Sequence, residues 1–208
     1  MFERLFGDRR GDPALAGRIP PGQYLTEKFP VLHYGSVPKV DLATWDFRVW
    51  GEVDNPLTLT WAEFGALPRT PLTADIHCVT RWSKLDTHWE GVSIRTVLEL
   101  AQVRPEAAFV VGHAEQGYTA NLPLSVLDDE DVILADTYEG VPLEPDHGYP
   151  LRGTVGHIPA QSGLESPYLW KGAKWLRGLE FMSKDRRGFW EQAGYHNRAD
   201  VWKEERFG

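Results

Sequence analysis

The 208-residue sequence contains a single cysteine, Cys78, and this scarcity excludes several kinds of site. One thiol cannot form an intrachain disulfide, and it cannot build the multi-cysteine sites that hold structural zinc or iron–sulfur clusters. A lone cysteine can be a buried apolar residue, a nucleophile, or one ligand of a metal whose other ligands come from outside the protein. The cysteine count alone leaves these three roles open.

The sequence also lacks a long apolar run, an excess of positive charge and an export signal. No segment approaches the ~20 apolar residues of a membrane span, and a net charge of −8 argues against a nucleic-acid-binding protein. Arg9 and Arg10 form a twin-arginine pair, but the residues that follow are too short and too polar for a signal peptide. We therefore expect a cytoplasmic protein.

The composition that is present, 42% hydrophobic and 25% charged, is typical of a globular protein, and the length fits one domain. Residues 1–24 are rich in glycine, proline and arginine and are predicted to form an N-terminal arm. Residues 25–208 are predicted to form a single domain. Its C-terminal part, residues 188–202, is too aromatic for a free tail and is expected to wrap back onto the domain.

Hydrophobic patterning predicts a strand-rich α+β fold. Thr60 and Glu63 have the spacing of a capping box that opens a short helix, and Ser93 is expected to cap a helix over 94–101. A buried strand is expected to end at 76–79. Further strands are predicted at 45–53, 108–111, 118–122, 132–136, 150–155 and 174–181.

The residues around Cys78 weaken the interpretation of a passive buried thiol. Its segment, residues 77–83, reads His-Cys-Val-Thr-Arg-Trp-Ser and is crowded with polar side chains. A cysteine hydrolase would need a histidine base within hydrogen-bond reach of the sulfur. His77 is adjacent in sequence, but in a strand it would point to the opposite face. A thiolate stabilised by Arg81 would instead suit a thiophilic metal.

The Cys78 segment, followed by Trp-Glu-Gly-Val at 89–92, resembles the molybdenum-ligand segment of the sulfite-oxidase-fold molybdopterin oxidoreductases. The sequence is most similar to their small, haem-free branch, which includes the catalytic subunit of the periplasmic methionine-sulfoxide reductase. Further matching segments follow in the same order along the chain, at 28–35, 117–124, 147–152 and 170–175. The resemblance therefore covers most of the sequence.

The resemblance implies a molybdenum–molybdopterin cofactor and assigns roles to nine residues. Cys78 is the expected molybdenum ligand and catalytic residue, and Arg81 is expected to face the substrate. Arginine and lysine suit the cofactor phosphate, as cations in an otherwise acidic protein. The residues expected to contact the cofactor, besides Cys78, are Leu32, His33, His113, His147, Arg152, Lys171 and Lys174.

The implied reaction moves one oxygen atom to or from a small sulfoxide- or sulfite-like substrate. No haem is expected in this chain, so a separate electron-transfer partner is needed. Residues 153–167 replace a shorter link of the family and are interpreted as an inserted loop. The alternatives are a protein that binds or carries molybdopterin without turnover and, with less support, a cysteine hydrolase.

Overall fold

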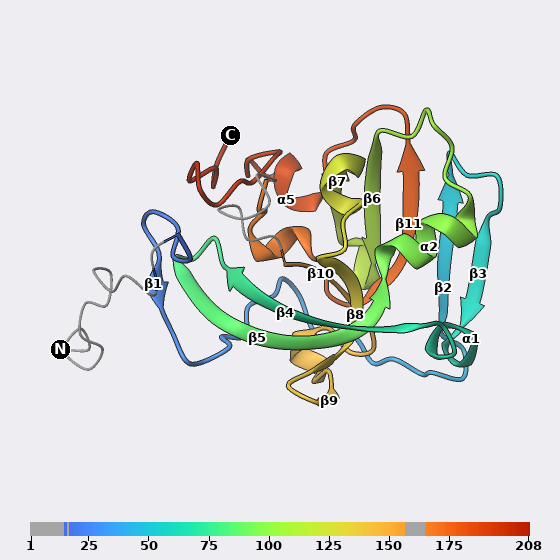
Figure 1. Cartoon of the computed structure of the whole chain (residues 1–208), viewed down its shortest axis with the longest axis horizontal. Helices are drawn as coiled ribbons and strands as arrows, with labels where there is room; N and C mark the ends of the chain where they lie inside the picture. The colour runs from blue at the N-terminus through green and yellow to red at the C-terminus, as the bar shows by residue number, and fades with distance from the viewer. Residues whose placement is uncertain (1–14, 16, 157–164) are drawn as a thin grey trace.

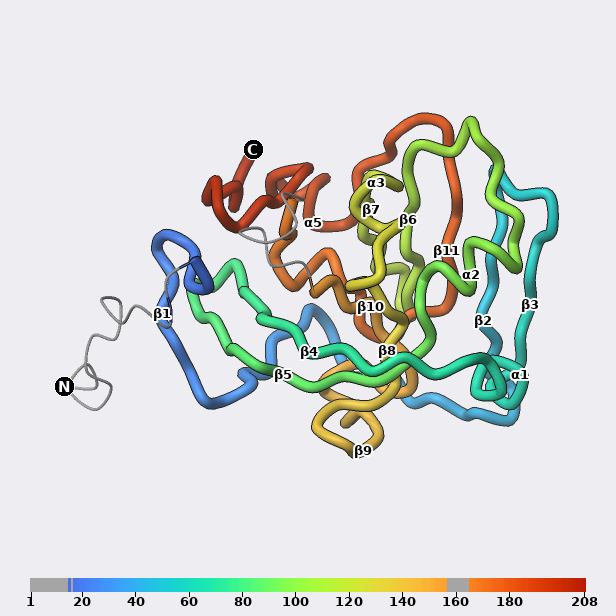
Figure 2. The backbone as a smooth tube through the Cα atoms, in the orientation of Figure 1, coloured from blue at the N-terminus to red at the C-terminus, as the bar shows by residue number. Residues whose placement is uncertain are grey.

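The computed structural model describes residue 15, residues 17–156 and residues 165–208. Parts of two predicted regions, the arm 1–24 and the insertion 153–167, lie outside the described residues. Figures 1 and 2 show two sheets with short helices at their margins and a C-terminal segment over one end. The strand-rich α+β class predicted from the sequence is confirmed.

The first sheet has the order β1-β5-β8-β10, with β4 paired to β5 and β9 paired to β8. Strands β4 and β5 form the long curved hairpin that runs along the lower side of the molecule in Figures 1 and 2. Its turn lies beside β1, which pairs in parallel with the start of β5. The strands are β1 (Tyr24–Leu25), β4 (Arg69–His77), β5 (Trp82–Ser93), β8 (Val132–Tyr138), β9 (Val141–Pro142) and β10 (Arg152–Val155).

The second sheet has the order β3-β2-β11-β6-β7 and stands upright at the right of Figure 1. Strands β2 and β11 are parallel, although β2 lies near the start of the chain and β11 near its end. The other pairs are antiparallel. The strands are β2 (Asp46–Gly51), β3 (Leu57–Thr60), β6 (Phe109–Ala114), β7 (Thr119–Pro123) and β11 (Leu176–Met182).

The helices are short, and two begin where their capping residues predict. Thr60 and Glu63 make both bonds of a capping box at α1 (Trp61–Gly65). The Ser93 side chain accepts from the Arg95 N–H at the start of α2 (Ile94–Ala101), whose buried face packs into the main core. The remaining helices are α3 (Leu124–Leu127), α5 (Phe189–Gln192), and the 3₁₀ turns η3 (Glu115–Gly117), η4 (Pro145–His147) and η5 (Leu169–Lys171).

The hairpin β4–β5 departs from the sequence prediction. β4 ends at His77, so Cys78 and Val79 lie in the turn after the strand and not at its end. The long strand β5 was not predicted, because it carries exposed polar residues and includes Asp86 at a φ of 53°. Thr87 sits fully buried inside it, where its hydroxyl donates to the Ala74 carbonyl at 2.5 Å.

Two apolar clusters hold the sheets together, and a third fixes the C-terminal segment. The main core fills the space between the sheets, and a second cluster includes Cys78, Trp82 and Trp89. In the third, Tyr168 packs with Ala199 and Val201, all three with no exposed surface. The aromatic C-terminal region was predicted to wrap back onto the domain, and this cluster packs residues 199 and 201 against Tyr168.

Among the described residues, no helix is both long enough and apolar enough to cross a membrane.

Candidate functional site

Cys78 lies in the tight turn between β4 and β5. Its N–H donates to the Trp82 carbonyl at 2.9 Å, and the Arg81 N–H donates back to the Cys78 carbonyl at 3.0 Å. Arg81 completes the turn with a φ of 75°, in the left-handed region. The Thr80 hydroxyl donates to Cys78 Sγ at 3.2 Å. The turn thus fixes both the backbone and the sulfur of Cys78.

The two ends of the described chain hold this turn from outside the hairpin. Gln23 donates from Nε2 to the Cys78 carbonyl at 3.1 Å. Arg206 donates from Nη1 to the Val79 carbonyl at 2.9 Å. Both side chains are buried, so these bonds are shielded from competing water. Segments almost the whole chain apart therefore position the candidate metal ligand.

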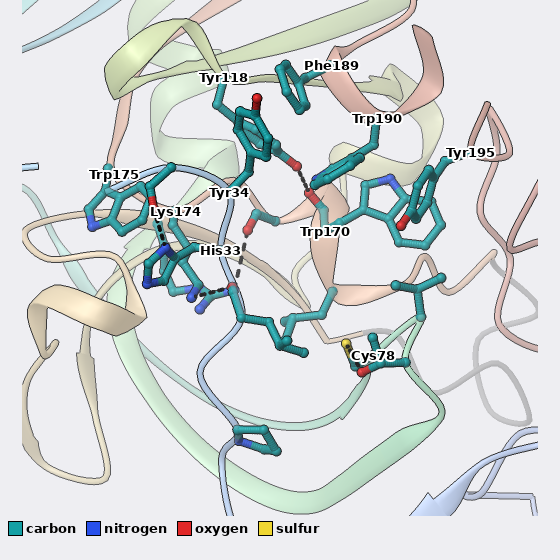
Figure 3. Close-up of a pocket in the computed structure, with 18 of the residues that line it drawn as sticks. His33, Tyr34, Cys78, Tyr118, Trp170, Lys174, Trp175, Phe189, Trp190 and Tyr195 are labelled. Carbon is teal, nitrogen blue, oxygen red and sulfur yellow. Dashed lines mark hydrogen bonds between the residues drawn. The ribbon is translucent and has the colours of Figure 1, made fainter. Parts of the chain in front are cut away.

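Cys78 faces a cavity of about 390 Å³, which is within the usual range for small-molecule sites. Figure 3 shows His33, Lys174 and Trp175 together on one side of it. Cys78 lies on the other side, below Trp170 and Tyr195. The cavity lining includes five of the nine predicted site residues, namely Leu32, His33, Cys78, Arg152 and Lys174.

Arg152 is the most unusual residue of the lining. Its guanidinium has no exposed surface, and it donates to the carbonyls of His147 at 3.0 Å and Gly172 at 3.3 Å. It also lies over the rings of Phe29 and Trp89. No carboxylate among the described residues pairs with it, and burial lowers its pKa to about 10. A buried cation without a counterion indicates a site for an anion.

Lys174 brings a second cation to the same side of the cavity. Its ammonium donates to the carbonyls of Leu32 at 2.9 Å and Asp146 at 2.6 Å. Burial and the neighbouring Arg152 lower its pKa to about 7. An anion bound beside this group would raise its pKa and favour the ammonium form.

Two further buried nitrogens near this side have no protein partner. Trp82 lines the cavity and its Nε1 is buried without a hydrogen bond. His147 stacks on Phe29 with ring centroids 4.0 Å apart, and its Nδ1 is likewise unbonded. Burial, with Lys174 and Arg152 nearby, lowers the pKa of His147 to about 4. His147 thus lies behind Phe29 and outside the lining itself.

The structure does not bring Arg81, His113 or Lys171 into the cavity lining. Arg81 is exposed beside Cys78. His113 lies on the second sheet, where it bonds Glu180 at 2.8 Å. Lys171 is buried away from the cavity, with its ammonium 2.6 Å from the Glu191 carboxylate. Their roles at the cofactor or substrate stay predictions, because side-chain direction depends on the surrounding fold and not on sequence position alone.

The hydrolase alternative finds no support from His77. Its ring is buried and 2.8 Å from the Ser83 hydroxyl, and burial lowers its pKa to about 4. The imidazole is therefore neutral and engaged with Ser83, which argues against a role as the base for Cys78.

The sequence analysis missed most of the aromatic lining. Phe29, Trp170, Phe189, Trp190 and Tyr195 all line the cavity. The one available signal was the aromatic C-terminal region, which was expected to fold back but was not connected with the site. Its approach to Cys78 depends on tertiary contacts that no local pattern reveals.

Comparisons with known proteins agree with this geometry. Residues 34–190 match the oxidoreductase molybdopterin binding domain. The chain is 46% identical, over 92% of its length and 93% of the relative, to the uncharacterized oxidoreductase YuiH of Bacillus subtilis (strain 168). It is 27% identical, over 89% of its length and 68% of the relative, to the putative protein-methionine-sulfoxide reductase subunit YedZ1 of Azospira oryzae.

Among solved structures, the sulfane dehydrogenase SoxCD from Paracoccus pantotrophus superposes with a TM-score of 0.62 at 22% identity. The match covers 73% of this chain and 41% of SoxCD, and it shows a shared fold. With the family match over three quarters of the sequence, the conclusion is direct. The chain belongs to the molybdopterin-binding oxidoreductases of the sulfite-oxidase fold.

Proposed function

We propose that this protein binds a molybdenum–molybdopterin cofactor through Cys78 and transfers an oxygen atom to or from a small substrate. The observation that carries the proposal is the pairing of Cys78 with Arg152 at one cavity. The thiolate is a suitable metal ligand, and the buried, unpaired guanidinium requires an anion. The name of one relative, a methionine-sulfoxide reductase subunit, describes an oxygen-transfer reaction.

The residues present fit the cofactor. Arg152 and Lys174 would hold its anionic groups, as two cations without carboxylate partners in the described chain. The unbonded Nε1 of Trp82 is a buried donor ready for one of its polar edges. Leu32 and His33 would pack against the pterin from the N-terminal side of the cavity.

The cofactor, when bound, supplies the two-electron chemistry of molybdenum, and the protein supplies position and environment. Cys78 offers its sulfur as the ligand, and the hydrogen bond from the Thr80 hydroxyl orients that sulfur. Gln23 and Arg206 hold the turn that carries it. The surrounding aromatic side chains exclude water, which strengthens the interaction of Arg152 with a bound anion.

Some expectations stay predictions. Arg81 is predicted to face the substrate, and its exposed position beside the turn leaves it outside the lining. A separate electron-transfer partner and a cytoplasmic location are proposed from the sequence alone. A protein that carries the cofactor without turnover is the alternative, because the same cavity could serve it.

The test is to produce the protein in a molybdate-fed host and to measure molybdenum and pterin per chain, together with turnover. We expect the wild type to contain both. Cys78→Ser should abolish turnover, because the thiolate ligand is lost, while Arg152 and Lys174 still retain pterin. Thr80→Val, which removes only the hydrogen bond to sulfur, is the matched control and should keep molybdenum.

Full turnover of Cys78→Ser with molybdenum bound would contradict the ligand assignment. A metal-loaded wild type whose molybdenum no substrate or dye can reduce would favour the carrier alternative. A protein free of molybdenum with a thiol that reacts readily with alkylating reagents would favour a hydrolase.

A further inference from the structure

The cavity has a second side that the cofactor proposal does not explain. Its lining there is a cluster of aromatic rings, which we call the aromatic wall. Figure 3 shows Trp170, Trp190 and Tyr195 above Cys78, whereas Tyr34 lies on the side of His33. The members of the aromatic wall are Tyr34, Trp170, Phe189, Trp190 and Tyr195.

The rings of the aromatic wall pack on one another. Trp190 has its ring centroid 4.9 Å from that of Tyr195 and 5.2 Å from that of Phe189. Tyr195 also meets Trp170 edge-on at 5.3 Å. Tyr34 reaches Phe189 at 5.1 Å from the opposite end of the chain. Contacts of this kind fix the ring planes before any ligand arrives.

A buried ion pair holds the aromatic wall from behind. Glu191 accepts from Trp170 Nε1 at 2.8 Å and pairs with Lys171 at 2.6 Å, and neither charged side chain has exposed surface. Tyr118 donates from its hydroxyl to the Trp170 carbonyl at 2.7 Å. The indole of Trp170 is thus tied at both its ring and its backbone. The arrangement is rigid, and its charges point away from the cavity.

The charge of the lining restricts what the aromatic wall can bind. Among the described residues, the only lysine and arginine of the lining are Lys174 and Arg152, which the proposed cofactor would occupy. Glu115, the one lining carboxylate, is already paired with Arg177 at 2.6 Å. A small anion such as sulfite would find no free lysine or arginine in the lining that the described residues form. A flat, uncharged group would find aromatic faces.

From these contacts we infer that the aromatic wall selects neutral S-oxides that carry a flat apolar group, such as aryl sulfoxides, over small anions. This inference rests on the proposed function. In the reduction, the S–O bond breaks and the sulfur is left as a thioether. The oxygen leaves as water with two protons, and two reduced viologen molecules supply the two electrons.

The experiment compares methyl phenyl sulfoxide, dimethyl sulfoxide and sulfite on the wild-type holoprotein and on Trp190→Ala. We expect the wild type to favour the aryl sulfoxide. Trp190→Ala should lower kcat/KM for that substrate about tenfold, as expected for the loss of one aromatic contact. The value for dimethyl sulfoxide should change by less than about twofold, because a methyl group gains little from the ring.

Two further variants and a binding measurement complete the test. Trp190→Phe keeps an aromatic ring and should restore most of the preference. Trp50→Ala, a half-buried tryptophan outside the lining, is the matched control and should leave the preference unchanged. Methyl phenyl sulfone, as a non-reacting probe, should bind more weakly to Trp190→Ala by the same factor, measured by calorimetry with molybdenum and pterin content checked in parallel.

Three results would overturn the inference. Equal losses with both sulfoxides, or a wild type that prefers sulfite, would show that the aromatic wall does not select. Loss of pterin from Trp190→Ala would assign the wall to the cofactor instead. A wild type without molybdenum would overturn the proposed function itself, and this inference with it.

Discussion

Two buried cations, Arg152 and Lys171, differ in their partners: one is paired with a carboxylate of the described residues and the other is not. Lys171 meets the Glu191 carboxylate at 2.6 Å and both oxygens of Asn121 at about 3 Å, so all three of its donors are used within the protein. Arg152 is equally buried but meets only carbonyl oxygens and ring faces. The first cation completes the fold, whereas the second one requires a ligand.

The comparison also separates the two halves of the cavity. In the half that contains Arg152 and Lys174, no carboxylate of the described residues forms a salt bridge with either side chain, and the acceptors of both are carbonyls. Behind the aromatic wall, by contrast, the buried charges of Lys171 and Glu191 neutralise each other. A buried charge that is paired within the chain rigidifies its surroundings, and one that is left unpaired marks a place where a ligand binds.

The largest expected loss of stability comes from replacing Lys171. Lys171→Met leaves Glu191 buried without its partner and should lower the free energy of unfolding by about 3–5 kcal/mol, measured by urea denaturation. The double variant Lys171→Met, Glu191→Leu removes both charges and should recover a large part of that loss. If the single variant unfolded no more easily than the wild type, the pair would not stabilise the fold.

Arg152→Met, in contrast to Lys171→Met, should reduce cofactor binding more than stability. The unfolding free energy of the cofactor-free protein should fall by less than about 2 kcal/mol, because the bonds lost go to neutral carbonyl acceptors and a costly buried charge is removed. Pterin content should fall at least about tenfold, since charge-assisted bonds to an anion are lost. Arg152→Lys should keep part of the pterin. A normal pterin content in Arg152→Met would break the comparison.

The last expected effect is a pH dependence of the unfolding free energy, caused by Lys174. Its pKa falls from 10.5 to about 7 on folding, so between these values the unfolded chain binds more protons than the folded one. The stability of the cofactor-free protein should therefore rise with pH in this window. Lys174→Met should flatten that rise, and Lys39→Met, at an exposed lysine, should not. If the stability of Lys174→Met depended on pH in the same way as that of the wild type, Lys174 would not be the group whose burial causes the rise.

Part of the candidate site could be predicted because its signal is local. The segment around Cys78 lies within a few residues, and the matching segments follow in order along the chain. Leu32, His33, Arg152 and Lys174 were placed by that order, and all line the cavity. The capping residues Thr60 and Ser93 likewise act within one turn of helix.

Other predicted site residues lie outside the cavity lining, because the direction of a side chain is not a local property. Lys171 and Lys174 are three residues apart, yet one ammonium is buried against Glu191 and the other lines the cavity. Lys171 ends a 3₁₀ turn and Lys174 lies in the short irregular stretch after it, so sequence spacing does not define a common face. Side chains alternate between the two faces of β6, and His113 lies on the face where its ring bonds Glu180.

The sequence by itself determined the strand-rich class, the family and the segment that carries the one thiol. Those properties follow from local pattern, composition and motif order. Only the tertiary structure decided which cation found a carboxylate and which rings met at the cavity. Gln23 and Arg206 meet the Cys78 turn from opposite ends of the chain. Such pairings arise when distant segments pack together, and no local rule specifies them.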